Sequence, residues 1–167
     1  RVLFRSGRVF TINAKGEVTA YDAATGKRLW RTKTPPKKED DGAFLGGGVA
    51  YEDGKLFVCG GFAQVVSLDA NTGRVLWRTP VDTPIHSAPT VNGGRVFAVT
   101  VENQVVSIAA STGKMLWTYS GASTPTILLG GAAPAVDGGV VIAAFTSGEL
   151  AALRVDTGTP LWNETVV

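Results

Sequence analysis

The sequence predicts an all-β fold of the propeller class, and the first observation that predicts it is a fourfold internal repeat. In each repeat a Thr-Gly pair is followed four residues later by a tryptophan, so all four tryptophans of the chain occupy one repeat position. Successive tryptophans are 47, 40 and 45 residues apart, which is a period typical of propeller blades. The four copies are the segments 21–30, 68–77, 108–117 and 153–162.

Continuous apolar runs, such as residues 96–99 and 140–145, are the second observation. A strand with one face in water alternates apolar and polar residues, whereas a strand that is covered on both faces does not. A blade that packs between two neighbouring blades is covered in this way. Gly-Gly turns and β-branched residues argue against a stack of helix pairs with the same period.

Each repeat is expected to form four antiparallel strands. In the third repeat these are residues 87–91, 95–101, 104–109 and 114–119, separated by turns. The Asp-x-x-Thr-Gly segment has a physical role, because the aspartate can accept hydrogen bonds from backbone amides two residues on, and glycine supplies a positive φ for a bulged hairpin. Pro160 fits a fourth strand at the outer edge, where a missing N–H is tolerated.

The expected domain organisation is a single partial propeller domain over residues 1–167. Its blades are expected at about 7–31, 43–79, 86–120 and 131–164. The first repeat begins near Gly7 without an inner strand before it, so residues 1–6 match no repeat position and the first blade is expected to be incomplete. Because a ring normally needs at least four blades, we expect the chain to be a segment of a longer protein.

Composition and charge exclude several classes of function. Apolar residues make up 44% and charged residues 18%, which predicts a folded chain. The net charge of +2 with scattered basic residues gives no support for a nucleic-acid partner or an anionic membrane surface. No run approaches eighteen apolar residues, so we expect no membrane-spanning helix. Cys59 is the only cysteine, which excludes an internal disulfide and a cysteine-cluster metal site.

Motifs for catalysis or ligand binding are weak, and we expect no catalytic residue, cofactor or metal. His86 is the only histidine, which excludes a histidine-based metal cluster, and we expect it in an inter-blade loop. The glycines at 46–48 and the pair 54–55 depart from a phosphate-binding loop in spacing, and no helix follows them. The segment 69–73 resembles the start of a calcium loop but lacks the later ligands.

The motif Ala-x-Asp-x-x-Thr-Gly-Lys-x-x-Trp at residues 20–30 resembles the tryptophan-docking repeat of the pyrroloquinoline-quinone-type propellers. The resemblance implies a partial ring of about four blades from an eight-bladed propeller, with each tryptophan packed between adjacent blades. That family includes quinoprotein dehydrogenases, with a cofactor on the axis, and non-catalytic propellers. The blade-docking residues that the resemblance implies are Trp30, Trp77, Trp117, Trp162, Gly26, Gly73, Gly113 and Gly158.

The finer resemblance is to the BamB-like lipoproteins of the outer-membrane β-barrel assembly machinery, and residues 86–97, 124–136 and 147–154 carry it. It implies a non-catalytic scaffold at the periplasmic face of the outer membrane, held there by a lipid anchor that this chain does not carry. The implied partners are the periplasmic domains of the barrel-forming protein and nascent outer-membrane proteins. In that family an apolar inter-blade loop contacts the barrel-forming partner. The corresponding residues here are Thr126, Ile127, Leu128 and Leu129.

Two readings of this loop stay open, because an apolar loop tip either folds into the core or anchors a partner. Two other functions also stay open: a fragment of a pyrroloquinoline-quinone-dependent dehydrogenase, and an extracytoplasmic sensor propeller. A dehydrogenase would need carboxylate ligands for a metal on the axis, and the expected inner strands at 88–91 and 133–136 carry no acid. The lone Cys59 also excludes, within this chain, the adjacent cysteine pair of many such enzymes.

Overall fold

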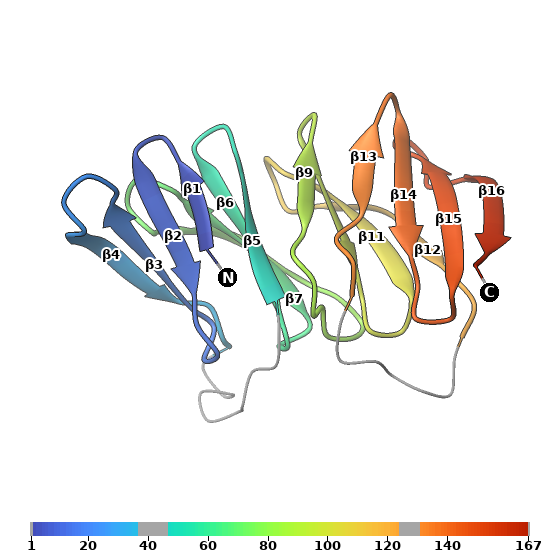
Figure 1. Cartoon of the computed structure of the whole chain (residues 1–167), viewed down its shortest axis with the longest axis horizontal. Coiled ribbons are helices and arrows are strands. Elements are labelled where there is room, and N and C mark those ends of the chain that lie inside the picture. Colours follow the sequence, from blue (N-terminus) through green and yellow to red (C-terminus); the bar gives the residue numbers. More distant parts are fainter. Residues whose placement is uncertain (1, 37–46, 124–130, 167) are drawn as a thin grey trace.

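The computed structural model describes residues 2–36, 47–123 and 131–166. Within these ranges the chain forms strands and turns and no helix, and the strands make up four antiparallel sheets of four strands each. Figure 1 shows the sheets standing side by side in chain order, as successive blades do. The predicted all-β fold with propeller-like, four-stranded blades is therefore confirmed. In the described part of the chain, no helix is long and apolar enough to cross a membrane.

Within every sheet the strands follow one another in sequence order, from an inner strand to an outer edge strand. The strands of the first two blades are β1 (Val2–Arg5), β2 (Arg8–Ile12), β3 (Glu17–Asp22), β4 (Arg28–Lys33), β5 (Gly47–Glu52), β6 (Lys55–Gly60), β7 (Gln64–Asp69) and β8 (Val75–Pro80). Those of the third and fourth blades are β9 (Thr90–Asn92), β10 (Arg95–Val99), β11 (Gln104–Ala109), β12 (Met115–Ser120), β13 (Ala135–Asp137), β14 (Val140–Ala144), β15 (Glu149–Arg154) and β16 (Pro160–Thr165).

The prediction that the first blade lacks its inner strand, and that residues 1–6 match no repeat position, is wrong. Residues Val2–Arg5 form β1 and pair with β2, with Leu3 opposite Phe10. The pair is closed by a two-residue turn in which Ser6 and Gly7 have φ of 51° and 70°. Two successive positive φ values are those of a type I′ hairpin. The Ser-Gly pair was the available signal for this turn.

The apolar core consists of three layers, each between two adjacent blades. In each of the first three blades the third residue of the second strand is a phenylalanine. These residues, Phe10, Phe57 and Phe97, are each at most 1% exposed. Each packs against the tryptophan of its own blade with ring centroids 5.9–6.0 Å apart. Both faces of an internal blade are therefore buried, which explains the continuous apolar runs in the sequence.

The Asp-x-x-Thr-Gly turn forms by the predicted mechanism in the first two blades. Oδ1 of Asp22 accepts hydrogen bonds from the backbone N–H of Ala24 and Thr25, at 3.1 and 2.8 Å, and from the Thr25 hydroxyl. Asp69 makes the same contacts with the second turn. Hydrogen bonds to a carboxylate favour its charged form. The side-chain and backbone bonds from Thr25 lower the pKa of Asp22 below its ordinary value, and bonds from the turn likewise lower the pKa of Asp69.

Candidate partner-binding site

The predicted partner-binding residues Thr126, Ile127, Leu128 and Leu129 lie outside the described residues. The described chain stops at Ser123 and resumes at Gly131, between the third and fourth blades. The surroundings of the site are therefore described by the residues that contact the chain just before residue 124 and just after residue 130. These residues come from the β10–β11 turn, the β14–β15 turn, the residues after β12 and the residues before β13.

Asn103 in the β10–β11 turn holds three of these segments together. It is 1% exposed, and its backbone has a φ of 60°. Its amide nitrogen donates to the carbonyl oxygen of Ala122 (2.8 Å), and its Oδ1 accepts from the backbone N–H and the hydroxyl of Thr146 (3.0 and 2.9 Å). One buried side chain thus connects the turn of the third blade, the turn of the fourth blade and the segment that leaves β12.

Ala122, two residues before the start of the undescribed segment, is held from both sides. Its carbonyl oxygen accepts from Asn103 of the third blade, and its N–H donates to Oε2 of Glu149 in the fourth blade (2.8 Å). The preceding Gly121 donates its N–H to the Asn103 carbonyl oxygen (2.9 Å). It also lies so close to Phe145 that an added Cβ would be 2.6 Å from the ring. The N-terminal end of the loop therefore has a fixed position relative to both blades.

The C-terminal end of the loop returns against the third blade. An added Cβ on Gly131 would lie 3.6 Å from Cβ of Ser87, whose side chain is buried. Further on, the hydroxyl of Thr90 in β9 donates to the carbonyl oxygen of Pro134. The residues before the segment 124–130 thus contact both blades, and those after it contact the third blade.

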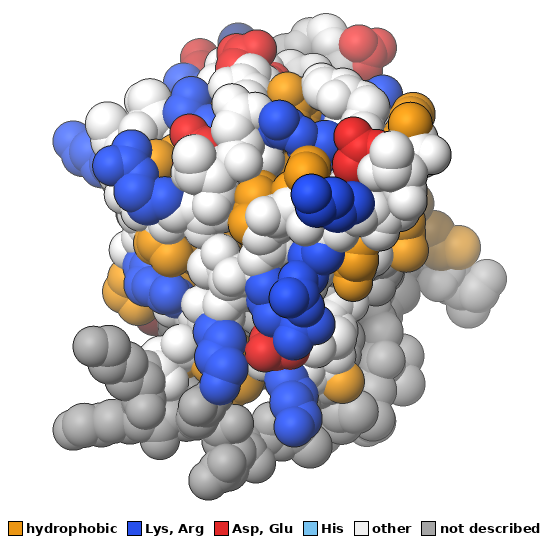
Figure 2. Space-filling view, turned by 90° about the vertical axis from the view of Figure 1, so that its left-hand side faces the viewer, with side chains coloured by type: hydrophobic (Ala, Val, Ile, Leu, Met, Phe, Trp, Pro, Cys, Tyr) orange, Lys and Arg blue, Asp and Glu red, His pale blue; other side chains and the backbone are white. Residues whose placement is uncertain are grey.

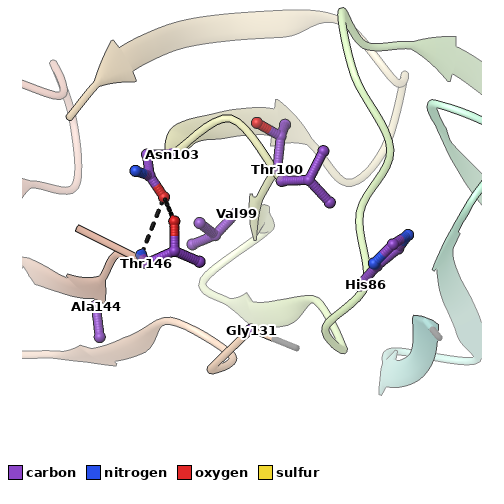
Figure 3. A pocket seen from close by; sticks show the side chains of 8 residues that line it. His86, Val99, Thr100, Asn103, Gly131, Ala144 and Thr146 are labelled. Carbon is purple, nitrogen blue, oxygen red and sulfur yellow. Dashed lines mark hydrogen bonds between the residues drawn. The ribbon is translucent and has the colours of Figure 1, made fainter. Parts of the chain in front are cut away.

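A small hollow lies where these segments meet, with Asn103 and Thr146 on one side and His86 on the other (Figure 3). The volume of this hollow that water can occupy is about 20 Å³. That volume holds about one water and is far smaller than a cofactor pocket. His86, expected in an inter-blade loop, lies in the connection between β8 and β9, and its carbonyl oxygen accepts from the N–H of Gly47 (3.1 Å).

The tryptophans lie at the blade junctions, on glycines of the following blade. The indole N–H of Trp30 donates to the carbonyl oxygen of Ala70 (3.1 Å), and an added Cβ on Gly73 would be 2.5 Å from the ring. Trp77 stands in the same relation to Ala110 and Gly113, and Trp117 to Val155 and Gly158. Trp162 of the fourth blade is 47% exposed, and an added Cβ on Gly26 of the first blade would meet nothing within 4 Å. These two residues therefore take part in no such junction within the described residues.

Titratable and nucleophilic groups do not gather in the part of the chain that the structure describes. In residues 2–36, 47–123 and 131–166, no three His, Cys, Asp or Glu side chains are placed to share a metal ion. Cys59 is 1% exposed in β6, and desolvation by burial raises the pKa of its thiol well above the ordinary value. A thiol in such surroundings is a poor nucleophile at neutral pH.

Sequence reasoning assigned Asn103 only to a hairpin turn and missed its connecting role. The residue before the third strand has a positive φ in every blade, and the other three are Gly16, Ala63 and Gly148. Asparagine is the one common residue that accepts this conformation and also offers an amide. An asparagine where other repeats have glycine or alanine was therefore the signal, although its partners Ala122 and Thr146 come from segments that only the fold brings together.

Comparison with solved structures shows the same fold at low sequence identity. BamB from Moraxella catarrhalis matches 99% of this chain with a TM-score of 0.86 and 21% identity. The quinohemoprotein alcohol dehydrogenase from Comamonas testosteroni matches 98% with a TM-score of 0.79 and 19% identity, and a europium-containing methanol dehydrogenase matches 98% with 0.75 and 20%. The chain spans 48%, 34% and 41% of these three proteins, respectively. The comparison with curated proteins gives no match.

Family membership is decided by the sequence itself. Residues 14–167 match the family described as outer membrane protein assembly factor BamB, and this match covers the last two strands of the first blade and the whole of the other three blades. The chain therefore belongs to the BamB family.

Proposed function

We propose that this chain is a non-catalytic part of a propeller scaffold for outer-membrane β-barrel assembly, and that it binds the barrel-forming partner through the loop between the third and fourth blades. The observation that carries the proposal is the double attachment of Ala122, to Asn103 of one blade and Glu149 of the next. A loop whose ends are fixed loses less conformational entropy when it binds.

The composition of the loop supports the same role. The segment 124–130 contains Ile127, Leu128 and Leu129 in succession, in the connection between the third and fourth blades. Apolar side chains in a connecting loop are favourable anchors when a partner covers them. Membership of the BamB family makes the periplasmic domains of the barrel-forming protein the partner to test first.

The test is to change Leu128 and Leu129 to aspartate in the protein and to measure its affinity for the isolated periplasmic domains of the barrel-forming protein. Loss of two apolar anchors should weaken binding at least about tenfold, because central apolar contacts of an interface carry most of its binding energy. The matched control is Leu116→Asp, which places an aspartate at a leucine of β12 that is 40% exposed. The control should bind normally.

Unchanged affinity of the double variant, with the control also unchanged, would rule out this loop as the contact. Thermal unfolding of each variant separates loss of contact from loss of fold. A double variant that unfolds at the temperature of the control and yet fails to bind supports the proposal.

A quinone-dependent dehydrogenase is the second candidate, and the similarity of fold to two dehydrogenase structures favours it. The inner strands carry few groups for such a site: β1, β5, β9 and β13 together contain two carboxylates, those of Glu52 and of the exposed Asp137. Titration with pyrroloquinoline quinone and calcium distinguishes the two candidates. A saturable change in quinone fluorescence at micromolar concentration would favour the enzyme.

A further inference from the structure

We propose that the turn between β11 and β12 of the third blade binds a carboxylate group from outside the chain, at the position that the carboxylates of Asp22 and Asp69 occupy in the first two blades. This turn lies at the opposite end of β12 from the loop between the third and fourth blades. The proposal is therefore independent of the proposed function.

The backbone of the turn is the same in the first three blades. In each, the turn glycine donates its N–H to the carbonyl oxygen of the residue at the Asp position, at 2.9 Å for Gly26 and 2.8 Å for Gly73 and Gly113. The φ values of these glycines are 69°, 73° and 76°. The residue after each glycine donates its N–H to the threonine hydroxyl, at 3.3 Å in all three turns. The N–H groups of the third turn therefore have the same arrangement as those that bind a carboxylate in the first two.

The donors that bind this carboxylate are present in the third turn, but the carboxylate is not. In the second blade, Oδ1 of Asp69 accepts from two successive N–H groups of the turn, at 2.9 and 2.8 Å, and from the Thr72 hydroxyl at 3.0 Å. In the third blade, Ala109 has no side-chain oxygen to accept from the corresponding groups. The N–H of Ser111 has no hydrogen-bond partner among the described residues, and that of Thr112 makes only a long bond to the Ala109 carbonyl oxygen (3.3 Å).

Two basic side chains flank the same position. Arg95 lies opposite Ala109 in the β10–β11 ladder, and the Ala109 N–H donates to the carbonyl oxygen of Lys114 (2.8 Å). Arg95 is half-buried and Lys114 is exposed. Neither cation forms an ion pair with a described residue. The positive charge beside this turn is therefore not balanced by a carboxylate of the turn itself.

The first two turns show how these surroundings act on a carboxylate. The pKa of Asp22 is lowered mainly by hydrogen bonds from the threonine of its turn, and further by the charge of Arg8. The pKa of Asp69 is lowered in the same way by its turn threonine, and further by the charge of Arg74. These two cations occupy the two positions that flank Ala109 in the third blade. Each contribution favours the charged form, so the position suits an ionised carboxylate.

Basic side chains alone do not distinguish the third turn. Figure 2 shows Lys and Arg side chains gathered on the side of the molecule that the first blade forms, yet the turn of that blade already holds the carboxylate of Asp22. The fourth turn has Arg154 at the Asp position, paired with Asp156 at 4.0 Å, and the uncharged Val140 and Thr159 at the flanking positions. Of these four turns, which all lie within the described residues, the third alone combines two cations with no carboxylate of its own.

A carboxylate from outside can reach this position. Ser111, Thr112 and Lys114 are exposed, and the side chain of Ala109 ends at Cβ. Backbone N–H groups of a turn form anion-binding concavities, and hydrogen bonds to a charged acceptor are stronger than those between neutral groups. A free carboxylate loses translational freedom on binding, unlike the tethered side chain of Asp69. We therefore expect half-saturation by a small carboxylate in the millimolar range.

The experiment is a titration of the protein, labelled with nitrogen-15, with sodium acetate at pH 7, followed by the NMR shifts of the backbone amides. Sodium chloride at the same ionic strength is the control for screening. The amides of Ser111 and Thr112 should shift saturably with acetate and not with chloride. Those of Asn71 and Thr72 should stay unchanged, because Asp69 already binds them. Absence of a saturable shift at Ser111 and Thr112, or equal shifts in both turns, would overturn the proposal.

Two substitutions exchange the properties of the second and third turns. Ala109→Asp supplies an internal carboxylate and should abolish the response of the third turn to acetate. Asp69→Ala removes one and should make the second turn respond as the third does. A response that survives Ala109→Asp would contradict the assigned position. If Ala109→Asp does not fold, Asp69→Ala and the comparison of the two turns in the parent protein still decide the question.

A third substitution tests the flanking charge. Lys114→Gln should raise the acetate concentration at half-saturation several-fold, because one of the two cations is lost. Its matched control is Lys27→Gln, at the same repeat position of the first blade, where the side chain is also exposed. The control should leave the response of the third turn unchanged. Equal effects of the two substitutions would contradict a direct role of Lys114.

The source of the carboxylate is distinguished with blocked peptides. A Gly-Asp-Gly peptide should shift the same amides as acetate, and its Gly-Asn-Gly counterpart should not. Tighter binding of the aspartate peptide than of acetate would identify an acidic side chain of a protein as the source. Equal binding of the two would identify a small free carboxylate. Binding of the asparagine peptide as tight as that of the aspartate peptide would overturn the proposal, because the site would then not recognise the carboxylate.

Discussion

The indole ring of Trp30 lies on Gly73 of the next blade, so closely that an added Cβ would be 2.5 Å from the ring. Gly73→Ala should therefore destabilise the protein for two reasons. A positive φ of 73° costs a non-glycine residue about 1–2 kcal/mol, and the displaced indole should cost about 1–3 kcal/mol more. Urea unfolding measures the loss. Gly54→Ala, with φ 75° and nothing within 4 Å, should show the first cost alone.

Equal losses for Gly73→Ala and Gly54→Ala would show that the tryptophan moves aside freely, contrary to this packing. A matching pair is available at the next junction. There Gly113 has an added-Cβ distance of 2.7 Å to Trp77, and Gly113→Ala should behave like Gly73→Ala.

The hydroxyls of Ser67 and Ser107 are buried beside the tryptophans, and neither has a hydrogen-bond partner in the described part of the chain. The first and fourth blades have Ala20 and Ala152 at the same ladder position, opposite Trp30 and Trp162. A buried hydroxyl without a partner costs about 1–3 kcal/mol. Ser67→Ala should therefore leave the free energy of unfolding unchanged or raise it by up to about 1 kcal/mol.

Chemical denaturation of Ser67→Ala and Ser107→Ala checks this expectation. The exposed Ser111→Ala serves as the control and should change stability by less than about 0.5 kcal/mol. A loss above about 1 kcal/mol for either buried serine would mean that its hydroxyl makes a favourable contact in the folded protein.

Ala109 stands where the first two repeats have Asp22 and Asp69, yet its turn keeps the backbone bond from Gly113 N–H to the Ala109 carbonyl oxygen (2.8 Å). Ala109→Asp should add the missing side-chain acceptor and raise the free energy of unfolding by a few tenths to about 1 kcal/mol. Because the folded-state pKa of such a carboxyl is lowered, the gain should be present above about pH 3.9, the ordinary value for Asp, and lost as the pH falls through the folded-state pKa.

Unfolding curves of Ala109→Asp and the parent chain at pH 7 and pH 3 measure this difference. Asp69→Ala is the reciprocal variant and should lose stability at pH 7, with a smaller loss at pH 3. A gain for Ala109→Asp that grew as the pH fell would contradict hydrogen bonding to the charged carboxylate.

Asn103→Gly should remove the side-chain bonds to Ala122 and Thr146 while keeping the positive φ of the turn, which Gly16 and Gly148 adopt in other blades. The side chain of Asn103 is 1% exposed, and its removal takes away three hydrogen bonds, so we expect a loss of about 1–3 kcal/mol. Exchange of backbone amide hydrogens should become faster in the β10–β11 turn, in the β14–β15 turn and at Ala122. Ala63→Gly, at the same turn position of the second blade with φ 47°, should be neutral or slightly stabilising.

An Asn103→Gly variant as stable as the Ala63→Gly control would show that the side chain of Asn103 does not stabilise the contact between the third and fourth blades. Asn103→Asp separates the two halves of the amide: its carboxylate can still accept from Thr146 but cannot donate to Ala122. We expect Asn103→Asp to be at least as destabilising as Asn103→Gly at pH 7, because its buried carboxylate would face the carbonyl oxygen of Ala122.

The sequence was sufficient for the repeat architecture because its signals are local. The aspartate turns, the two-residue hairpins and the Thr-Gly-to-Trp spacing each act within about ten residues, and each recurs in several blades. Strand β1 was not predicted because Val2–Arg5 carries none of the repeated motifs. Only its pairing with β2 shows that it belongs to the first blade. Whether a segment with a weak local preference becomes a strand thus depends on the strand with which it pairs.

The candidate site was less accessible to sequence reasoning, for the same physical reason. Asn103 lies 19 residues from Ala122 and 43 residues from Thr146, and Ala122 takes part only through its backbone, so only the fold brings these partners together.

The most direct measurement of partner binding is hydrogen–deuterium exchange of the chain with and without the periplasmic domains of the barrel-forming protein. Binding through the loop between the third and fourth blades should slow exchange in peptides covering 121–134 and in the neighbouring turns around Asn103 and Thr146. Exchange in the first blade, residues 2–33, should be unchanged. Slower exchange elsewhere with no change at 121–134, or no change anywhere at saturating concentrations of the periplasmic domains, would contradict the proposed contact.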